Sequence, residues 1–107
     1  GMFGAGTYFA DKTTKSVRYC GNTGQLLLCR VSLGRAYVTG AAQPHLRRPP
    51  EPLPIWTDQI GLWWKNQKFH SVWGSCDTLP RSLLMNEFIV YHTNQGYPEY
   101  IVDFEMK

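Results

Sequence analysis

Five prolines fall between positions 44 and 54 of this 107-residue chain, and they place the strongest limit on its fold. Proline lacks a backbone N–H and fixes φ, so it is excluded from helix interiors and from central strands. We therefore predict a long loop over residues 40–69, with regular structure on either side of it. The same stretch contains Trp56, Trp63 and Trp64, whose side chains we expect to fold back onto the domain. A loop of this length in a compact domain is more often functional than structureless.

Short apolar segments on both sides of this loop predict a β-rich domain with one short helix. Residues 26–33 are almost continuously apolar, which favours a strand buried on both faces. Asp11 has the side chain of a helix N-cap, and Gly21-Asn22-Thr23-Gly24 predicts the turn that ends the helix. The predicted elements are strands at residues 8–10, 25–33, 36–38, 88–91 and 97–106 and a helix at residues 12–19.

The composition fits one small folded domain. Eleven Lys and Arg residues against eight Asp and Glu residues give a formal net charge of +3. This mild excess suits a small anionic ligand, and we expect no nucleic-acid partner for this segment. No apolar run approaches the ~18 residues of a membrane helix, so no membrane partner is expected. The three cysteines are too irregularly spaced for a metal-binding pair, and reduced thiols in an intracellular protein are the simplest interpretation.

The segment from Gly4 to Tyr19 brings aromatic rings and a hydroxyl close together. Ser16 and Tyr19 are three residues apart and share one face of the predicted helix, while Tyr8 lies on the strand before it. If strand and helix pack together, the two tyrosine rings can enclose a flat or cationic group. On residue types alone, ordinary packing of both tyrosines is the more frequent alternative.

Glu87 is a single acid in a very apolar run, between Leu83-Leu84-Met85 and Phe88-Ile89-Val90. Such a carboxylate either points to solvent from an edge strand or is buried and has a task, and base rates slightly favour the solvent-facing alternative. Asp11 is better explained as a helix cap than as a catalytic group. Lys12 and Lys15 fit solvated positions, and one of them could face an anion.

Several blocks of the chain, taken in order, resemble the catalytic domain of the poly(ADP-ribose) polymerase family, most closely that of the tankyrases. They extend from end to end of the chain except near residues 40–69. The blocks are Gly1-Met2-Phe3-Gly4-Ala5-Gly6-Thr7-Tyr8-Phe9-Ala10-Asp11 with Lys15-Ser16 and Tyr19-Cys20, then residues 26–34, His70-Ser71-Val72, Asn86-Glu87-Phe88-Ile89-Val90-Tyr91, and Tyr97-Pro98-Glu99-Tyr100-Ile101.

This resemblance implies that NAD is the substrate and assigns a role to each site residue. Tyr8 and Tyr19 would stack on the nicotinamide, and the Ser16 hydroxyl would bind its carboxamide. Glu87, catalytic together with Tyr8, would bind the 2′-hydroxyl of the nicotinamide ribose and polarise the incoming nucleophile. The other residues implied to bind NAD are Phe9 and Ala10 in the pocket wall, Lys15 beside it, and Gly4 in the loop that covers the site. A carboxylate near the sugar stabilises the positive charge that builds up as the bond to nicotinamide breaks, and no metal is required.

The resemblance also implies an α+β ADP-ribosyltransferase fold, with mostly antiparallel split β-sheets and a short helix. The family's catalytic histidine lies in a His-Gly pair upstream of the first block, and none of His45, His70 or His92 has that context. We therefore expect residues 1–107 to be the C-terminal part of the catalytic domain, with the N-terminal half absent. The zinc-binding insertion of tankyrases, expected after Tyr19, is replaced by the turn at residues 21–24.

The predicted function is NAD-dependent ADP-ribosyl transfer to protein side chains and to a growing poly(ADP-ribose) chain, with release of nicotinamide. The predicted location is the nucleus or the cytoplasm. A competing hypothesis is an inactive binding or scaffold module that docks a partner through the Trp-rich loop. A third is a ribose- or nucleic-acid-binding β domain, which the net charge supports only weakly.

Overall fold

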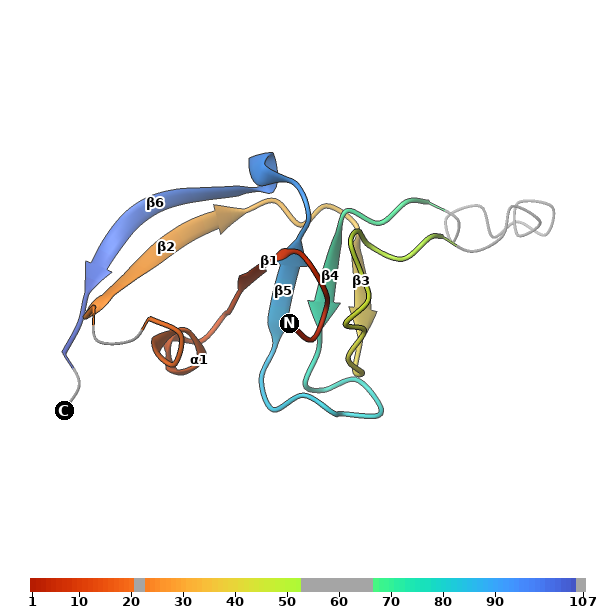
Figure 1. Cartoon of the computed structure of the whole chain (residues 1–107), viewed down its shortest axis with the longest axis horizontal. Helices are drawn as coiled ribbons and strands as arrows, with labels where there is room; N and C mark the ends of the chain where they lie inside the picture. Colours follow the sequence, from red (N-terminus) through yellow and green to blue (C-terminus); the bar gives the residue numbers. More distant parts are fainter. Residues whose placement is uncertain (21–22, 53–66, 106–107) are drawn as a thin grey trace.

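The computed structural model describes residues 1–20, 23–52 and 67–105, which form an α+β fold of two sheets (Figure 1). The first sheet has the strand order β1-β5-β4-β3, and the second pairs β2 with β6. The elements are β1 (Thr7–Phe9), α1 (Thr13–Val17), β2 (Gln25–Val31), β3 (Ala36–Thr39), β4 (Ser71–Gly74), β5 (Glu87–Val90), the 3-10 helix η3 (Thr93–Gln95) and β6 (Gly96–Asp103). The predicted α+β class with mostly antiparallel, split sheets is confirmed, since among the described strands only β3 and β4 pair in parallel.

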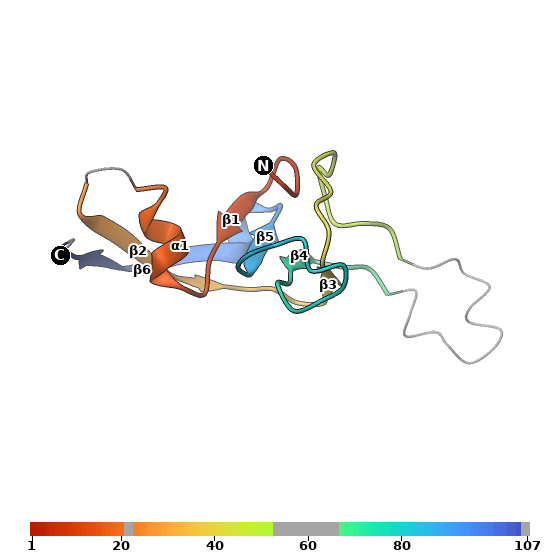
Figure 2. The same ribbon diagram turned by 90° about the horizontal axis from the view of Figure 1, so that it is seen from below.

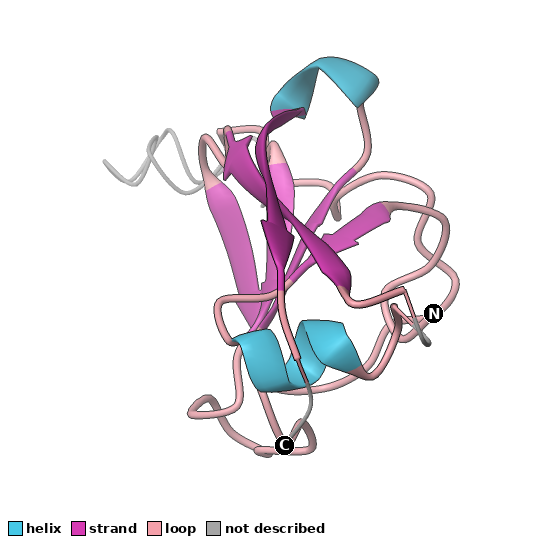
Figure 3. Ribbon diagram, turned by 90° about the vertical axis from the view of Figure 1, so that its left-hand side faces the viewer, coloured by secondary structure: helices cyan, strands magenta, loops and turns pink. Residues whose placement is uncertain are grey.

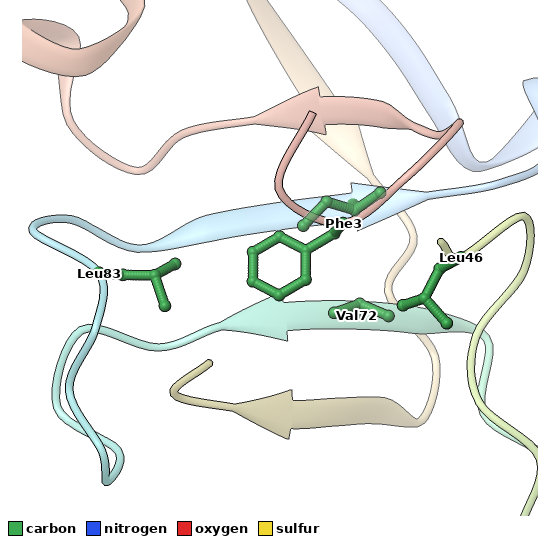
Figure 4. Packing of buried hydrophobic residues seen from close by; sticks show 5 residues of the cluster. Phe3, Leu46, Val72 and Leu83 are labelled. Atoms are coloured by element: carbon green, nitrogen blue, oxygen red, sulfur yellow. The ribbon is translucent and has the colours of Figure 1, made fainter. Parts of the chain in front are cut away.

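The four-stranded sheet presents one row of side chains to the core. Tyr8 of β1 lies opposite Ile89 of β5, Ile89 lies opposite Val72 of β4, and Val72 lies opposite Tyr37 of β3. Because side chains alternate along a strand, these four residues share one face. Figure 4 shows Phe3, Leu46 and Leu83 lying over this face, and with Val72 and Ile89 they form the buried cluster.

The opposite face of the same sheet is aromatic. Trp73 of β4 and Phe88 of β5 are register partners, and their rings stack at 5.5 Å with an interplanar angle of 27°. Ser71 and Val90, the next register pair on this face, are buried, so both faces of β4 and β5 contain buried residues.

The β2–β6 ribbon, formed by the second sheet, extends away from the first sheet (Figure 2). Its long apolar side chains are exposed, with Leu27 at 60% and Leu28 at 55%. The sequence predicts that residues 25–33 form a strand and that this strand is buried on both faces. The second part of that prediction is wrong. The apolar run does form a strand, but its residues are exposed or half-buried and none is fully buried.

Three local predictions also need correction. The helix is shorter than predicted, and its N-cap is Lys12 rather than Asp11, with no side-chain capping bond. Ser71–Gly74 is a strand that the sequence did not predict, and it lies in the centre of the first sheet. The predicted turn after residue 93 is the short helix η3, and Figure 3 shows the two helical segments at opposite ends of the sheets.

Residues 40–52 and 67–69 contain no helix or strand, yet part of this segment is firmly packed. Leu46 is buried in the core, and the Phe69 ring meets Tyr37 edge-on at 5.3 Å. The three tryptophans expected to fold back lie outside the described residues. Within the parts of the chain that the structure describes, no helix has the length and apolar character needed to cross a membrane.

Candidate active site

The glycine-rich turn before β1 is closed by the Tyr8 hydroxyl. This hydroxyl donates a hydrogen bond to the Gly4 carbonyl at 2.6 Å and accepts one from the Phe3 amide at 3.0 Å. Gly4 has a φ of +77°, and a Cβ there would lie 1.7 Å from the Leu46 carbonyl oxygen, so only glycine fits. The sequence thus places Tyr8 as predicted next to the turn, with its hydroxyl fixed by backbone groups.

Tyr91 fastens the same turn from β5. Its hydroxyl donates to the Phe3 carbonyl at 2.7 Å. Burial, with a smaller contribution from Tyr8, raises the pKa of Tyr91 to about 12. Two tyrosine hydroxyls therefore hold the backbone of the turn over the buried face of the sheet.

The beginning of α1 lies against three consecutive residues at the start of β5. Asn86 Nδ2 donates to the Asp11 carboxylate at 3.0 Å, and Thr14 Oγ1 lies 3.9 Å from the Met85 sulfur. Lys15 Nζ lies 3.0 Å from Glu87 Oε1. Asp11 therefore joins the segment before α1 to the residue before β5 and does not cap the helix.

Glu87 lies on the central strand β5 and is only 6% exposed. The alternative in which it points to solvent from an edge strand is therefore excluded. It shares the core face of the sheet with Ile89, whose neighbour across the strands is Tyr8. Its Oε1 atom pairs with Lys15, whereas its Oε2 atom is buried and has no hydrogen-bond partner among the described residues. A buried carboxylate oxygen without a donor is costly and is an acceptor available to a ligand hydroxyl.

A hollow of about 270 Å³ lies beside this ion pair. It is enclosed by the N-terminal turn, α1 and the segment before β5. Two of its lining residues, Lys15 and Arg18, are cationic, which suits an anionic ligand. The lining residues are Met2, Lys15, Arg18, Ser82, Leu83, Leu84 and Met85.

The remaining predicted site residues surround α1 without forming a closed pocket. Tyr19 is 80% exposed, and its ring pairs with no other aromatic ring among the described residues. Ser16 is half-buried one residue after Lys15. Phe9 points to the face opposite Tyr8 and lies against Gly96 of β6, while Ala10 is half-buried after β1. The structure thus brings Tyr8, Lys15 and Glu87 to one region and leaves Tyr19 at the surface.

The histidines lie elsewhere. His70 and His92 line a larger cleft of about 440 Å³ at the end of the sheet where β4 begins, whereas Glu87 lies at the end where β4 finishes. Among the described residues no carboxylate lines either cavity, but the smaller hollow is lined by Lys15, the ion-pair partner of Glu87, so we place the chemistry there. In residues 1–20, 23–52 and 67–105, no three His, Cys, Asp or Glu side chains are grouped closely enough to hold a metal ion.

Sequence reasoning missed the part played by Asn86. In the sequence, only its position next to Glu87 indicated a role for Asn86. Its three hydrogen-bond partners lie 10 to 75 residues away in the chain, so no local pattern reveals them. Arg18 was also missed, because the face of a five-residue helix that meets the hollow depends on how the helix packs.

Comparison with known proteins gives one consistent answer. The poly(ADP-ribose) polymerase catalytic domain matches residues 1–106. Similar proteins include poly(ADP-ribose) polymerase 2-A of Oryza sativa subsp. japonica, with 32% identity over 99% of this chain and 19% of its own length. Poly(ADP-ribose) polymerase of Drosophila melanogaster is 32% identical over 99% of this chain and 12% of its own length. Poly(ADP-ribose) polymerase 2 of Homo sapiens is 48% identical over 40% of this chain and 8% of its own length. The chain therefore spans less than a fifth of the length of these relatives.

Proposed function

Since this chain belongs to the poly(ADP-ribose) polymerase catalytic domain family, we propose that it takes part in transferring ADP-ribose from NAD to protein side chains, with release of nicotinamide. The relatives' names support this reaction class and do not support a tankyrase-like subtype. Growth of a poly(ADP-ribose) chain and a nuclear or cytoplasmic location belong to the proposal as well.

The observation that carries this proposal is the half-satisfied carboxylate of Glu87. Lys15 occupies one of its oxygens, and the other is buried without a donor. A ribose hydroxyl of NAD is a donor of the kind this oxygen lacks, so the residues present fit the substrate. The carboxylate's negative charge, held in a site shielded from water, stabilises positive charge that develops on the sugar.

The neighbouring residues complete the proposed site. Tyr8 and Tyr19 supply the rings that stack on nicotinamide, and the Ser16 hydroxyl binds its carboxamide. Within the described residues that hydroxyl has no hydrogen-bond partner, so it is available to a ligand. Phe9, Ala10 and Gly4 form the surroundings of the ring. Stacking and hydrogen bonding hold the leaving group in the geometry that bond cleavage requires.

The test is transfer of label from NAD by the natural full-length protein, comparing two glutamates that each pair with a cation. Glu87 is buried beside Lys15, and Glu99 is on the β2–β6 ribbon beside Arg30. We expect Glu87→Gln to lower the transfer rate by about 100-fold or more and to leave only single ADP-ribose units on the acceptor. Glu99→Gln should keep the wild-type rate.

Two outcomes would refute the proposal. A Glu87→Gln protein that still makes long polymer would remove Glu87 from the chemistry. A wild-type protein that binds NAD without transferring label would favour the scaffold hypothesis.

A further inference from the structure

We infer that Asn86 is a positioning residue for Glu87, acting together with Asp11. This inference rests on the proposed function, because it assigns the carboxylate of Glu87 to the reaction. Asn86 immediately precedes Glu87, and its side chain bonds to Asp11, four residues before the Lys15 that pairs with Glu87.

The Asn86 side chain makes three hydrogen bonds, and each partner comes from a different segment. Its Oδ1 atom accepts hydrogen bonds from Trp73 Nε1 at 3.3 Å and from the Cys76 amide at 3.0 Å. Its Nδ2 atom donates to Asp11 Oδ2 at 3.0 Å. One side chain thus connects β4, the turn after β4 and the segment that leads into α1.

These bonds determine where Lys15 lies relative to Glu87. Asp11 and Lys15 are four residues apart at the start of α1, and their partners Asn86 and Glu87 are adjacent in the chain. Loss of the Asn86–Asp11 bond would allow α1 to move along β5 and take the Lys15 ammonium away from Glu87. Displacement of a catalytic group by about 1 Å is enough to lower a rate by about 100-fold.

The chemistry of the position requires an amide. Asn86 must accept from two N–H groups and donate to a carboxylate at the same time. Asp accepts in the same geometry but has no hydrogen to donate, and it would bring a second negative charge against Asp11. Asn86→Asp therefore breaks one bond of the three and keeps the shape of the side chain.

A reciprocal exchange in the natural full-length protein tests this inference. We expect Asn86→Asp to lower kcat by about 10-fold to 100-fold and also to raise the KM for NAD, because α1 carries Ser16 as well as Lys15. The double variant Asn86→Asp with Asp11→Asn restores a donor facing an acceptor, now in the reverse direction. Its kcat should return to within about threefold of wild type.

Two further measurements separate positioning from general stability. Ser71→Ala is the matched control, because the Ser71 hydroxyl donates to the Leu33 carbonyl at 2.7 Å at the far end of the same sheet. It should lower the melting temperature and leave kcat unchanged. The NMR signal of the Lys15 ammonium should be protected from exchange in wild type, lost in Asn86→Asp and recovered in the double variant.

The outcomes distinguish a failure of the proposed function from a failure of this inference. A wild-type protein without NAD turnover would refute the proposed function, and the Lys15 signal would still decide whether Asn86 sets the ion pair. An Asn86→Asp protein with wild-type kcat, or one whose Lys15 signal is unchanged, would overturn the inference. So would a double variant that recovers the melting temperature but not kcat.

Discussion

The four-stranded sheet and the β2–β6 ribbon have similar apolar strands but very different surroundings. Val72 and Ile89 of the sheet, and Phe3 packed over them, are completely buried. In the ribbon, Leu27 is 60% exposed and Ile101 is 65% exposed. An apolar sequence therefore predicts a strand, whereas burial of that strand depends on what packs against it.

The same contrast holds for the two cross-element ion pairs. Lys15–Glu87 and Arg30–Glu99 have similar N–O distances, at 3.0 Å and 2.6 Å. Their side chains are 17% and 7% exposed in the first pair, against 79% and 27% in the second. Exposure to water rather than distance separates a pair that supports a site from one that lies on the surface.

The largest expected difference is between Phe3→Ala and Leu27→Ala in this 107-residue chain. Phe3 fills the centre of the core over Gly74 and Val72, so its loss leaves a cavity and should lower the free energy of unfolding by about 4 kcal/mol. Leu27 is already mostly in water, and its truncation should lower that free energy by about 1 kcal/mol or less. Chemical denaturation of both variants measures the two values.

Repeating both substitutions in the natural full-length protein would sharpen the comparison. A loss of several kcal/mol at Leu27 there would show that another part of that protein covers the ribbon. Equal losses at both positions in the 107-residue chain would contradict the contrast drawn here.

Much of the secondary structure was predictable because it depends on local pattern. The strands at β1, β2, β3, β5 and β6 follow apolar runs that end at glycine or polar turns. Ser71–Gly74 was missed because its four residues, two of them small or polar, show no β pattern of their own. It becomes a strand through hydrogen bonds to β3 and β5, which are tertiary contacts.

The candidate site was predictable in its residue types and not in its contacts. The family resemblance pointed to Tyr8, Lys15 and Glu87, whereas residue types alone favoured ordinary packed or solvated positions. The pairing of β1 with β5 and the Lys15–Glu87 ion pair bring their segments together. The role of Asp11 was wrong because a carboxylate before a helix has two possible partners, the free helix amides and a distant side chain. The structure shows that it binds Asn86, which no local rule could predict.

Removing the cation from each ion pair, Lys15–Glu87 and Arg30–Glu99, should give the next largest difference. Lys15→Met leaves the Glu87 carboxylate buried without a cation and should lower the free energy of unfolding by about 3 kcal/mol. Arg30→Met removes a partner that water replaces, so its effect should stay below about 1 kcal/mol. Denaturation at low and high salt measures both, and a larger loss for Arg30→Met would reverse the ranking of the two regions.

The smallest expected effect concerns Tyr91, whose hydroxyl donates a hydrogen bond to the Phe3 carbonyl. Tyr91→Phe should lower the free energy of unfolding by about 1 kcal/mol at neutral pH, the contribution of one such hydrogen bond. Burial raises the pKa of Tyr91 from 10.0 to about 12, so the folded chain keeps this proton more tightly than the unfolded chain does. The resulting stabilisation is complete below pH 10.0 and is lost as the pH rises toward about 12.

Unfolding measured across that pH range should therefore show a steeper decline for wild type than for Tyr91→Phe. Tyr100→Phe is the matched control, because Tyr100 is 63% exposed on the ribbon and its removal leaves the Tyr91 proton in place. Parallel curves for wild type and Tyr91→Phe would mean that the turn over the sheet opens before Tyr91 ionises. In that case the N-terminal turn would be as accessible to solvent as the β2–β6 ribbon. The boundary between the buried sheet and the solvent-exposed part of the chain would then lie inside the candidate site.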